Sequence, residues 1–158
     1  MKNYICINGK KAELTEEQLK ALGIELPKPS PFARVREKQP FYFICSDGNV
    51  SEKVEYCGVF DNSCYSSGNY CTDKSLMEQR VLHETLNRLL WRYSMEHDGD
   101  KIQLNHSWGL GYSKGIFEAY ELFGHVWGEC VFYSKEIAKA AIKEIIEPFM
   151  AAHPDFKW

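Results

Sequence analysis

The chain has 158 residues, of which 44% are hydrophobic and 14% aromatic, so it carries enough apolar material for one packed domain and a small additional unit. Its 19 basic and 22 acidic side chains give a net charge of −3, which is too acidic for a typical nucleic-acid-binding protein and too mildly acidic for a protein that imitates DNA. The N-terminus lacks the apolar segment of a signal peptide, and no run is long enough to span a membrane. We therefore expect a soluble protein of the cytoplasm.

Residues 1–26 predict a small ββα unit. Two short strands, at residues 4–7 and 11–14, are followed by the sequence Thr-Glu-Glu-Gln. In this pattern the hydroxyl of Thr15 accepts a hydrogen bond from the first turn of a helix, while the side chain of Gln18 bonds back to the cap. A short helix is therefore expected directly after the second strand.

Residues 27–40 hold four of the six prolines in the chain. Proline-rich segments are stiff and extended, so we expect a linker or a strap that lies across the main domain. The domain boundary is placed here, and residues 41–158 form the predicted main domain.

The first half of the main domain begins with an aromatic strand at residues 41–45 and a partner strand at 49–56. Residues 61–63 carry side chains typical of loops, and residues 69–71 predict a short strand. Thr72 is the predicted N-cap of a long helix. The apolar stripe of this helix consists of Met77, Val81, Leu82, Leu86, Leu89, Leu90 and Tyr93.

The second half contains a glycine-rich segment at residues 109–115. It is similar to a dinucleotide-binding fingerprint, but it precedes a strand where that fingerprint has to open a helix, so we interpret it as a turn. Further strands are predicted at residues 101–105, 115–123 and 126–133, which are rich in aromatic and β-branched side chains.

Ser134 is the predicted N-cap of a second helix, which Pro148 is expected to kink or end because it has no N–H. The tail, residues 153–158, is expected to be loose. Both halves pass from strands to a hydroxyl-capped helix, which indicates either a remote internal duplication or the generic way in which a strand leads into a helix. The predicted fold is α+β, an antiparallel sheet with two main helices packed on one face.

Three cysteines, Cys57, Cys64 and Cys71, are spaced seven residues apart. Structural zinc sites bring two ligands together within a C-x2-4-C pattern, which is absent here, and cytoplasmic thiols stay reduced. We therefore favour buried thiols over a metal site or a disulfide, and we place these cysteines on neighbouring strands. No cofactor and no catalytic constellation is predicted, since no nucleophile has a base at a useful spacing.

Eight aromatic side chains crowd into residues 108–133. Because helices can cover only one face of a sheet, some rings are expected at the surface, where Tyr and Trp are typical of protein–protein contacts. The alternative is that loops or the N-terminal strap cover them. Stacking on bases is disfavoured by the acidic side chains among the rings. The predicted partner-binding residues are Trp108, Tyr112, Tyr120 and Trp127.

Four segments carry a family resemblance: KNYICINGKKAELTEEQLKALGI, PFYFICSDGNV, FDNSCYSSGNYCTDKSLMEQ and ECVFYSKEIAKAAIKEI. Their order resembles small uncharacterised proteins of phages and prophages of low-GC Gram-positive bacteria. In that set an Asp…Tyr…Gly-Asn segment, here Asp61, Tyr65 and Gly68-Asn69, leads to a capped helix. The resemblance implies a phage accessory protein, a class whose members often act against the defences of the host.

The leading hypothesis is a phage-encoded protein that binds a host defence protein, such as a CRISPR effector, and inhibits it by occlusion in the host cytoplasm. One alternative is a sponge for a nucleotide signal, with Arg88 and Arg92 as anion ligands at helical i,i+4 spacing. A small enzyme and a nucleic-acid-binding regulator are further alternatives, although direct nucleic-acid binding is disfavoured by the charge.

Overall fold

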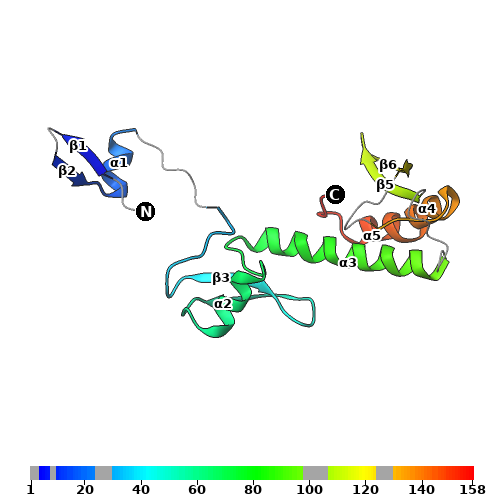
Figure 1. Cartoon of the computed structure of the whole chain (residues 1–158), viewed down its shortest axis with the longest axis horizontal. Helices are drawn as coiled ribbons and strands as arrows, with labels where there is room; N and C mark the ends of the chain where they lie inside the picture. The colour runs from blue at the N-terminus through cyan, green and yellow to red at the C-terminus, as the bar shows by residue number, and fades with distance from the viewer. Residues whose placement is uncertain (1–3, 8–9, 24–29, 98–106, 124–129) are drawn as a thin grey trace. The chain divides into compact units, whose positions relative to one another are not determined.

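The computed structural model describes residues 4–7, 10–23, 30–97, 107–123 and 130–158 (Figure 1). The chain divides into two compact units, Met1–Ala33 and Arg34–Trp158. The division falls inside the segment 27–40, of which residues 27–29 lie outside the described part. Helices and antiparallel strand pairs make up both units, which confirms the predicted α+β class.

The first unit is the ββα arrangement that the sequence predicts. Strands β1 (Tyr4–Ile7) and β2 (Lys10–Glu13) pair antiparallel, and helix α1 (Glu16–Ala21) follows. The capping box is formed: Gln18 N donates to Thr15 Oγ1 at 3.3 Å, and Thr15 N donates to Gln18 Oε1 at 2.9 Å. Local sequence alone therefore determines where this helix begins.

The second unit opens with the antiparallel hairpin of β3 (Pro40–Ile44) and β4 (Val50–Val54). Helix α2 (Val59–Ser66) comes next, so the prediction of a loop at residues 61–63 is wrong. The physical reason is that Asp61 is the third residue of the helix, where its carboxylate accepts hydrogen bonds from backbone N–H groups at the helix start. Aspartate favours both turns and helix starts, and the sequence does not distinguish them.

The long helix α3 spans Lys74–His97. Its N-cap is Asp73 rather than the predicted Thr72, because Asp73 Oδ1 accepts from Ser75 N at 2.9 Å and from Leu76 N at 3.4 Å. Of the predicted apolar stripe, Met77, Leu86, Leu90 and Tyr93 are buried, whereas Leu89 is exposed.

Strands β5 (Ser107–Ser113) and β6 (Ile116–Leu122) form a second hairpin, so the interpretation of residues 109–115 as one turn is wrong. Only Lys114 and Gly115 turn the chain, with φ of 53° and 83°. Gly109 lies in the strand because the Tyr120 ring packs against it: a Cβ there would lie 2.9 Å from Tyr120 Cζ. The predicted strand 101–105 and the first half of the predicted strand 126–133 lie outside the described residues, and residues 130–133 form no strand beyond the isolated bridge of Phe132.

Ser134 caps the next helix as predicted, since its side chain accepts from Ile137 N at 3.3 Å. Helix α4 (Lys135–Ala141) continues through a π-helical turn, η2 (Ile142–Ile146), into α5 (Glu147–Ala152). Pro148 lies in the first turn of α5, directly after this wide turn, where its missing N–H is tolerated. The helix is therefore interrupted at this point and does not end.

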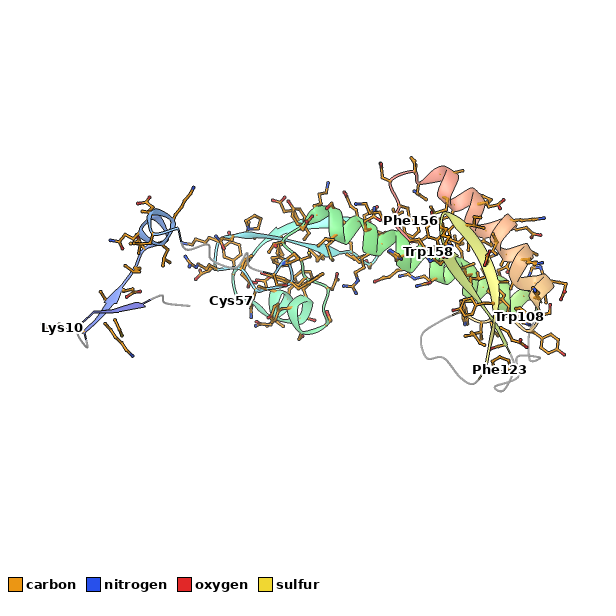
Figure 2. All side chains as sticks on the ribbon, turned by 90° about the horizontal axis from the view of Figure 1, so that it is seen from above. Lys10, Cys57, Trp108, Phe123, Phe156 and Trp158 are labelled. Atoms are coloured by element: carbon orange, nitrogen blue, oxygen red, sulfur yellow. The ribbon has the colours of Figure 1, made fainter. Side chains whose placement is uncertain are left out.

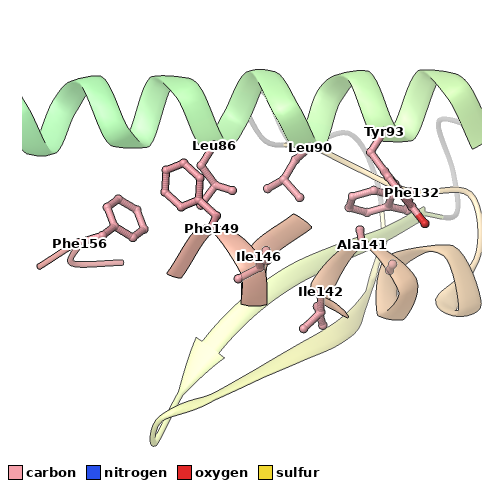
Figure 3. Close-up of a cluster of buried hydrophobic side chains, with 10 residues drawn as sticks. Leu86, Leu90, Tyr93, Phe132, Ala141, Ile142, Ile146, Phe149 and Phe156 are labelled. Atoms are coloured by element: carbon pink, nitrogen blue, oxygen red, sulfur yellow. The ribbon is translucent and has the colours of Figure 1, made fainter. Parts of the chain in front are cut away.

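The main core lies where α3 packs against η2 and α5, as Figure 3 shows. Its buried side chains are Leu86, Leu90, Tyr93, Phe132, Ala138, Ala141, Ile142, Ile146, Phe149 and Phe156.

The C-terminal tail docks onto this core, and its predicted looseness is wrong. Phe156 is buried against His83 and Phe149, at ring-centroid distances of 4.6 and 5.4 Å. The side-chain amide of Gln79 bonds the backbone of Asp155 and Lys157, at 2.9 Å each. The amide fixes the backbone on both sides of the buried ring, so the tail is ordered without secondary structure.

The two halves of the second unit repeat one construction. In each, the first strand of the hairpin pairs with a single residue that lies just before the helix cap: Tyr42 with Cys71, and Trp108 with Phe132. Both bridges are reciprocal, with N–O distances of 2.7 and 3.0 Å in the first half and 2.8 Å twice in the second. Apart from these single-residue bridges, the strands in the described residues form separate two-stranded sheets, whereas the sequence predicts one sheet.

Candidate functional site

The four aromatic residues predicted to bind a partner do not form one described surface. Trp108, labelled in Figure 2, is half-buried on β5, and Lys135 Nζ lies 5.1 Å from its ring centroid. Tyr112 and Tyr120 are both exposed, but the register of the hairpin places them on opposite faces. Trp127 lies outside the described residues.

The two arginines of the sponge alternative lie exposed on α3, and each is paired with a glutamate one turn away. Arg88 Nη2 is 3.2 Å from Glu84 Oε2, and Arg92 Nε is 2.9 Å from Glu96 Oε1. These pairs are typical of a solvated helix face. The glutamates also place negative charge where a phosphate would have to bind.

The three evenly spaced cysteines lie in different surroundings, and their predicted placement on neighbouring strands is wrong. Cys57 is exposed in the loop before α2, Cys64 is buried within α2, and Cys71 is buried just before α3. None of them forms a disulfide. Burial raises the pKa of the Cys64 thiol, which makes it an unreactive, packed side chain.

The most unusual feature of the described residues is a pair of buried carboxylates that hold the loop between β4 and α2. The first is Glu55, which is completely buried. Arg34 donates to it twice, from Nη2 at 2.9 Å and Nε at 3.2 Å. Tyr70 Oη donates at 2.9 Å and the backbone N of Cys57 at 2.7 Å. The Arg34 guanidinium lowers the pKa of Glu55, and burial raises the pKa of Tyr70 to about 12.

The second buried carboxylate is Asp61. Lys53 Nζ lies 2.8 Å from its Oδ1, and Oδ2 accepts from Tyr56 N at 3.0 Å and Gly58 N at 3.1 Å. The Lys53 hydrogen bond lowers the pKa of Asp61 to about 2. Together the two carboxylates bind three consecutive backbone N–H groups, those of residues 56, 57 and 58.

The hydrogen bonds to the two carboxylates hold Cys57, labelled in Figure 2, at a φ of 56°. This value lies in the left-handed region, which costs a residue other than glycine about 1 kcal/mol. The loop therefore has one fixed conformation. Next to solvent lie the side chains of Tyr56, which belongs to this loop, and of Val59 and Phe60, the first two residues of α2, with exposed fractions of 61%, 90% and 45%. We call these three residues the Val59 patch.

Sequence reasoning missed this site, although the resemblance pattern contains part of it. Asp61 is one of the two carboxylates that bind the loop backbone. Tyr65 packs edge-on against Tyr70 at a centroid distance of 5.4 Å. Gly68 has a φ of 72°, and the Asn69 side chain bonds both N and O of Ile44 at 2.8 Å. The pattern thus marks the residues that build the scaffold behind the patch.

The fold and the site define an α+β protein that exposes large apolar side chains at a loop held by buried carboxylates and at the start of the helix that follows it. Comparison of the chain with protein-family models, with curated proteins and with solved structures finds no match in any of the three. In the part of the chain that the structure describes, no helix has the length and apolarity needed to cross a membrane.

Proposed function

We propose that this chain is a binding protein that attaches to another protein and blocks its surface. The observation that supports the proposal is the Val59 patch: large exposed side chains in and directly after a loop that two buried carboxylates, each paired with a partly exposed cation, hold in place. A fixed loop loses little conformational entropy on binding, and aromatic side chains are favoured at the centre of interfaces. Local strain that the surroundings hold in place is typical of functional loops.

The two carboxylates act in this proposal as structural groups. All the hydrogen bonds described for Glu55 and Asp61 join them to Arg34, Lys53, Tyr70 and the loop backbone, and both have lowered pKa values. Carboxylates that stay ionised and bonded in this way are poor general acids or bases near neutral pH. Binding therefore fits the site better than catalysis.

The partner that we propose is a bacterial defence protein, such as a CRISPR effector, and the mode of action is occlusion in the cytoplasm of the host. This part of the proposal rests on the resemblance to phage accessory proteins. The mild acidity of the chain supports a protein partner over a nucleic acid.

The test is an affinity capture with the tagged full chain from lysate of a bacterium that carries defence systems, followed by an activity assay on the purified partner. We expect Val59→Asp to weaken binding at least tenfold and to relieve inhibition, because it places a charge in the centre of the patch. Ile116→Asp is the matched control, since Ile116 is also β-branched and exposed but lies on β6.

Two outcomes would contradict the proposal. Capture of no defence protein would remove the proposed partner, and unchanged binding and inhibition by Val59→Asp would remove the patch as the binding surface. Tyr112→Ala and Tyr120→Ala test the surfaces that the sequence predicts. A loss of binding in those variants alone would place the interface on the β5–β6 hairpin.

A further inference from the structure

A groove with a volume of about 480 Å³ lies between β3 and α2. Residues of α2 and its C-cap, Ser67, line it at a spacing of i, i+3, i+4 and i+7, so they form one face of the helix. Phe60 belongs both to this face and to the Val59 patch, which makes the groove continuous with the patch. The lining residues are Phe43, Ile44, Cys45, Ser46, Phe60, Ser63, Cys64, Ser67 and Asn69.

The chemistry of the groove excludes a charged occupant. None of its lining residues carries a charge, although 26% of the chain does. Lys53, whose Nζ lies 4.1 Å from the centroid of the Phe60 ring, is already bound to Asp61. A phosphate or carboxylate placed in the groove would lose hydration without gaining a partner, which is costly.

The lining favours an aromatic ring. Phe43 and Phe60 meet edge to face, with ring centroids 5.1 Å apart. A third ring that joins such a pair gains an attraction between the rings in addition to the effect of the area that it buries. The thiols of Cys45 and Cys64 add polarizable, weakly polar surface beside these rings.

Two hydroxyls at the groove are available for hydrogen bonds. Ser67 Oγ donates to Cys64 O, and the side-chain amide of Asn69 is bonded at both ends to Ile44. In contrast, Ser46 and Ser63 have no side-chain hydrogen bond to any described residue. Aromatic surface with free hydroxyls suits a ring that carries one polar group, as tyrosine and tryptophan do.

We propose that this groove binds one uncharged aromatic side chain, of tyrosine or tryptophan, from the same protein that contacts the Val59 patch. The inference rests on the proposed function and specifies the chemistry of the partner. In this proposal the Val59 patch is the flat part of the interface, and the groove is the pocket that receives one anchoring ring. Side chains buried in such pockets usually contribute most of the binding energy of an interface.

The first experiment tests the groove on the full chain without the partner. Cys45 lines the groove and is half-buried, whereas Cys57 is exposed outside it, so their rates of alkylation by iodoacetamide, resolved by peptide mass spectrometry, form an internal comparison. The probe is p-cresol, which is the tyrosine side chain alone. We expect it to slow alkylation of Cys45 several-fold at millimolar concentration and to leave Cys57 unchanged. The charged ring p-toluenesulfonate should have no effect.

The second experiment tests the link to the partner. Ser63→Phe fills the groove, and Ser66→Phe adds the same ring to an exposed position of α2 that does not line the groove. We expect Ser63→Phe to weaken partner binding at least tenfold, and Ser66→Phe to bind like the wild type. Circular dichroism on both variants verifies that they fold.

The outcomes separate the two proposals. Equal alkylation of Cys45 with and without p-cresol, or equal protection by the sulfonate, overturns the groove as a site for an uncharged ring. Full binding by Ser63→Phe overturns its role in the interface and leaves the proposed function standing. If the wild-type chain captures no partner, the proposed function fails, and so does the proposal that the ring in the groove comes from that partner. Protection of Cys45 by p-cresol still decides whether the groove binds a ring.

Discussion

The substitution Glu55→Gln tests whether the buried carboxylate holds the loop that presents the Val59 patch. Glutamine has the shape of glutamate but no charge, and one of its two terminal atoms is an NH2 group that cannot accept a hydrogen bond. Whichever way the amide turns, the variant loses one Arg34 bond. It also loses the bond from either Tyr70 or Cys57.

The size of the effect follows from these lost bonds. A hydrogen bond to a charged group contributes about 1.5–3 kcal/mol, and leaving a buried group without its partner adds to the loss. We therefore expect the free energy of unfolding to fall by about 3 kcal/mol. This value is at the low end of the loss expected when one partner of a buried ion pair is removed, because Arg34 is partly exposed. For a domain of this size that corresponds to a fall in Tm of roughly 10 °C.

The assay is urea unfolding followed by tryptophan fluorescence, with Glu37→Gln as the control because Glu37 is exposed. The pH dependence adds a second check. Since Arg34 lowers the pKa of Glu55 below its ordinary 4.5, the carboxylate stabilises the fold above that pH and loses this contribution as the pH falls through its folded pKa. The stability difference between wild type and variant should thus be constant from pH 6 to 8 and shrink below about 4.5.

A loss of less than about 1 kcal/mol at neutral pH would show that Glu55 contributes no more than an exposed ion pair does and would contradict the prediction. A difference that does not shrink in acid would show that the stabilisation does not come from the charge of Glu55. The same variant should also weaken partner binding at temperatures where it is folded, because Tyr56 and Val59 are no longer held in one conformation.

Two further predictions concern the second half of the unit. Phe156→Ala should lower the free energy of unfolding by about 3 kcal/mol, because the ring is buried against the core. It should also raise the rate of amide exchange in the tail of the folded protein, and an unchanged Tm would show that the tail does not dock. Gly109→Ala should lower the free energy of unfolding by about 1–3 kcal/mol, because its Cβ would lie 2.9 Å from the Tyr120 ring. Gly111→Ala should lower it less, because its Cβ would lie 3.2 Å from that ring, and equal effects in denaturant titrations would contradict the close packing of the ring.

The features that could be predicted from the sequence are those that short segments determine. The caps at Thr15 and Ser134 are satisfied within three residues, so their side-chain chemistry identifies them directly. The β3–β4 hairpin is also predictable, because aromatic and β-branched residues flank a glycine that turns the chain at Gly48 with a φ of 85°.

The features that were missed depend on contacts between distant residues. Gly109 has the composition of a turn, but its place in a strand depends on a ring eleven residues further along the chain. The tail has no periodicity, and its order depends on contacts such as those of the Gln79 amide and of the core that buries Phe156. Neither partner can be identified from the segment that it stabilises, which is why pattern reasoning fails at both places.

The candidate site is missed for a related reason, which also bears on its purpose. A charged residue is normally assigned to solvent when only the sequence is known, yet Glu55 and Asp61 are both buried and each is paired with a cation. Buried ion pairs are a poor means of gaining stability, because apolar side chains of similar volume usually stabilise a fold as well or better. Apolar side chains cannot, however, accept hydrogen bonds from three consecutive backbone N–H groups. The two carboxylates therefore specify a conformation more than they add stability, and the conformation that they specify is the one that holds Tyr56 and Val59 in solvent.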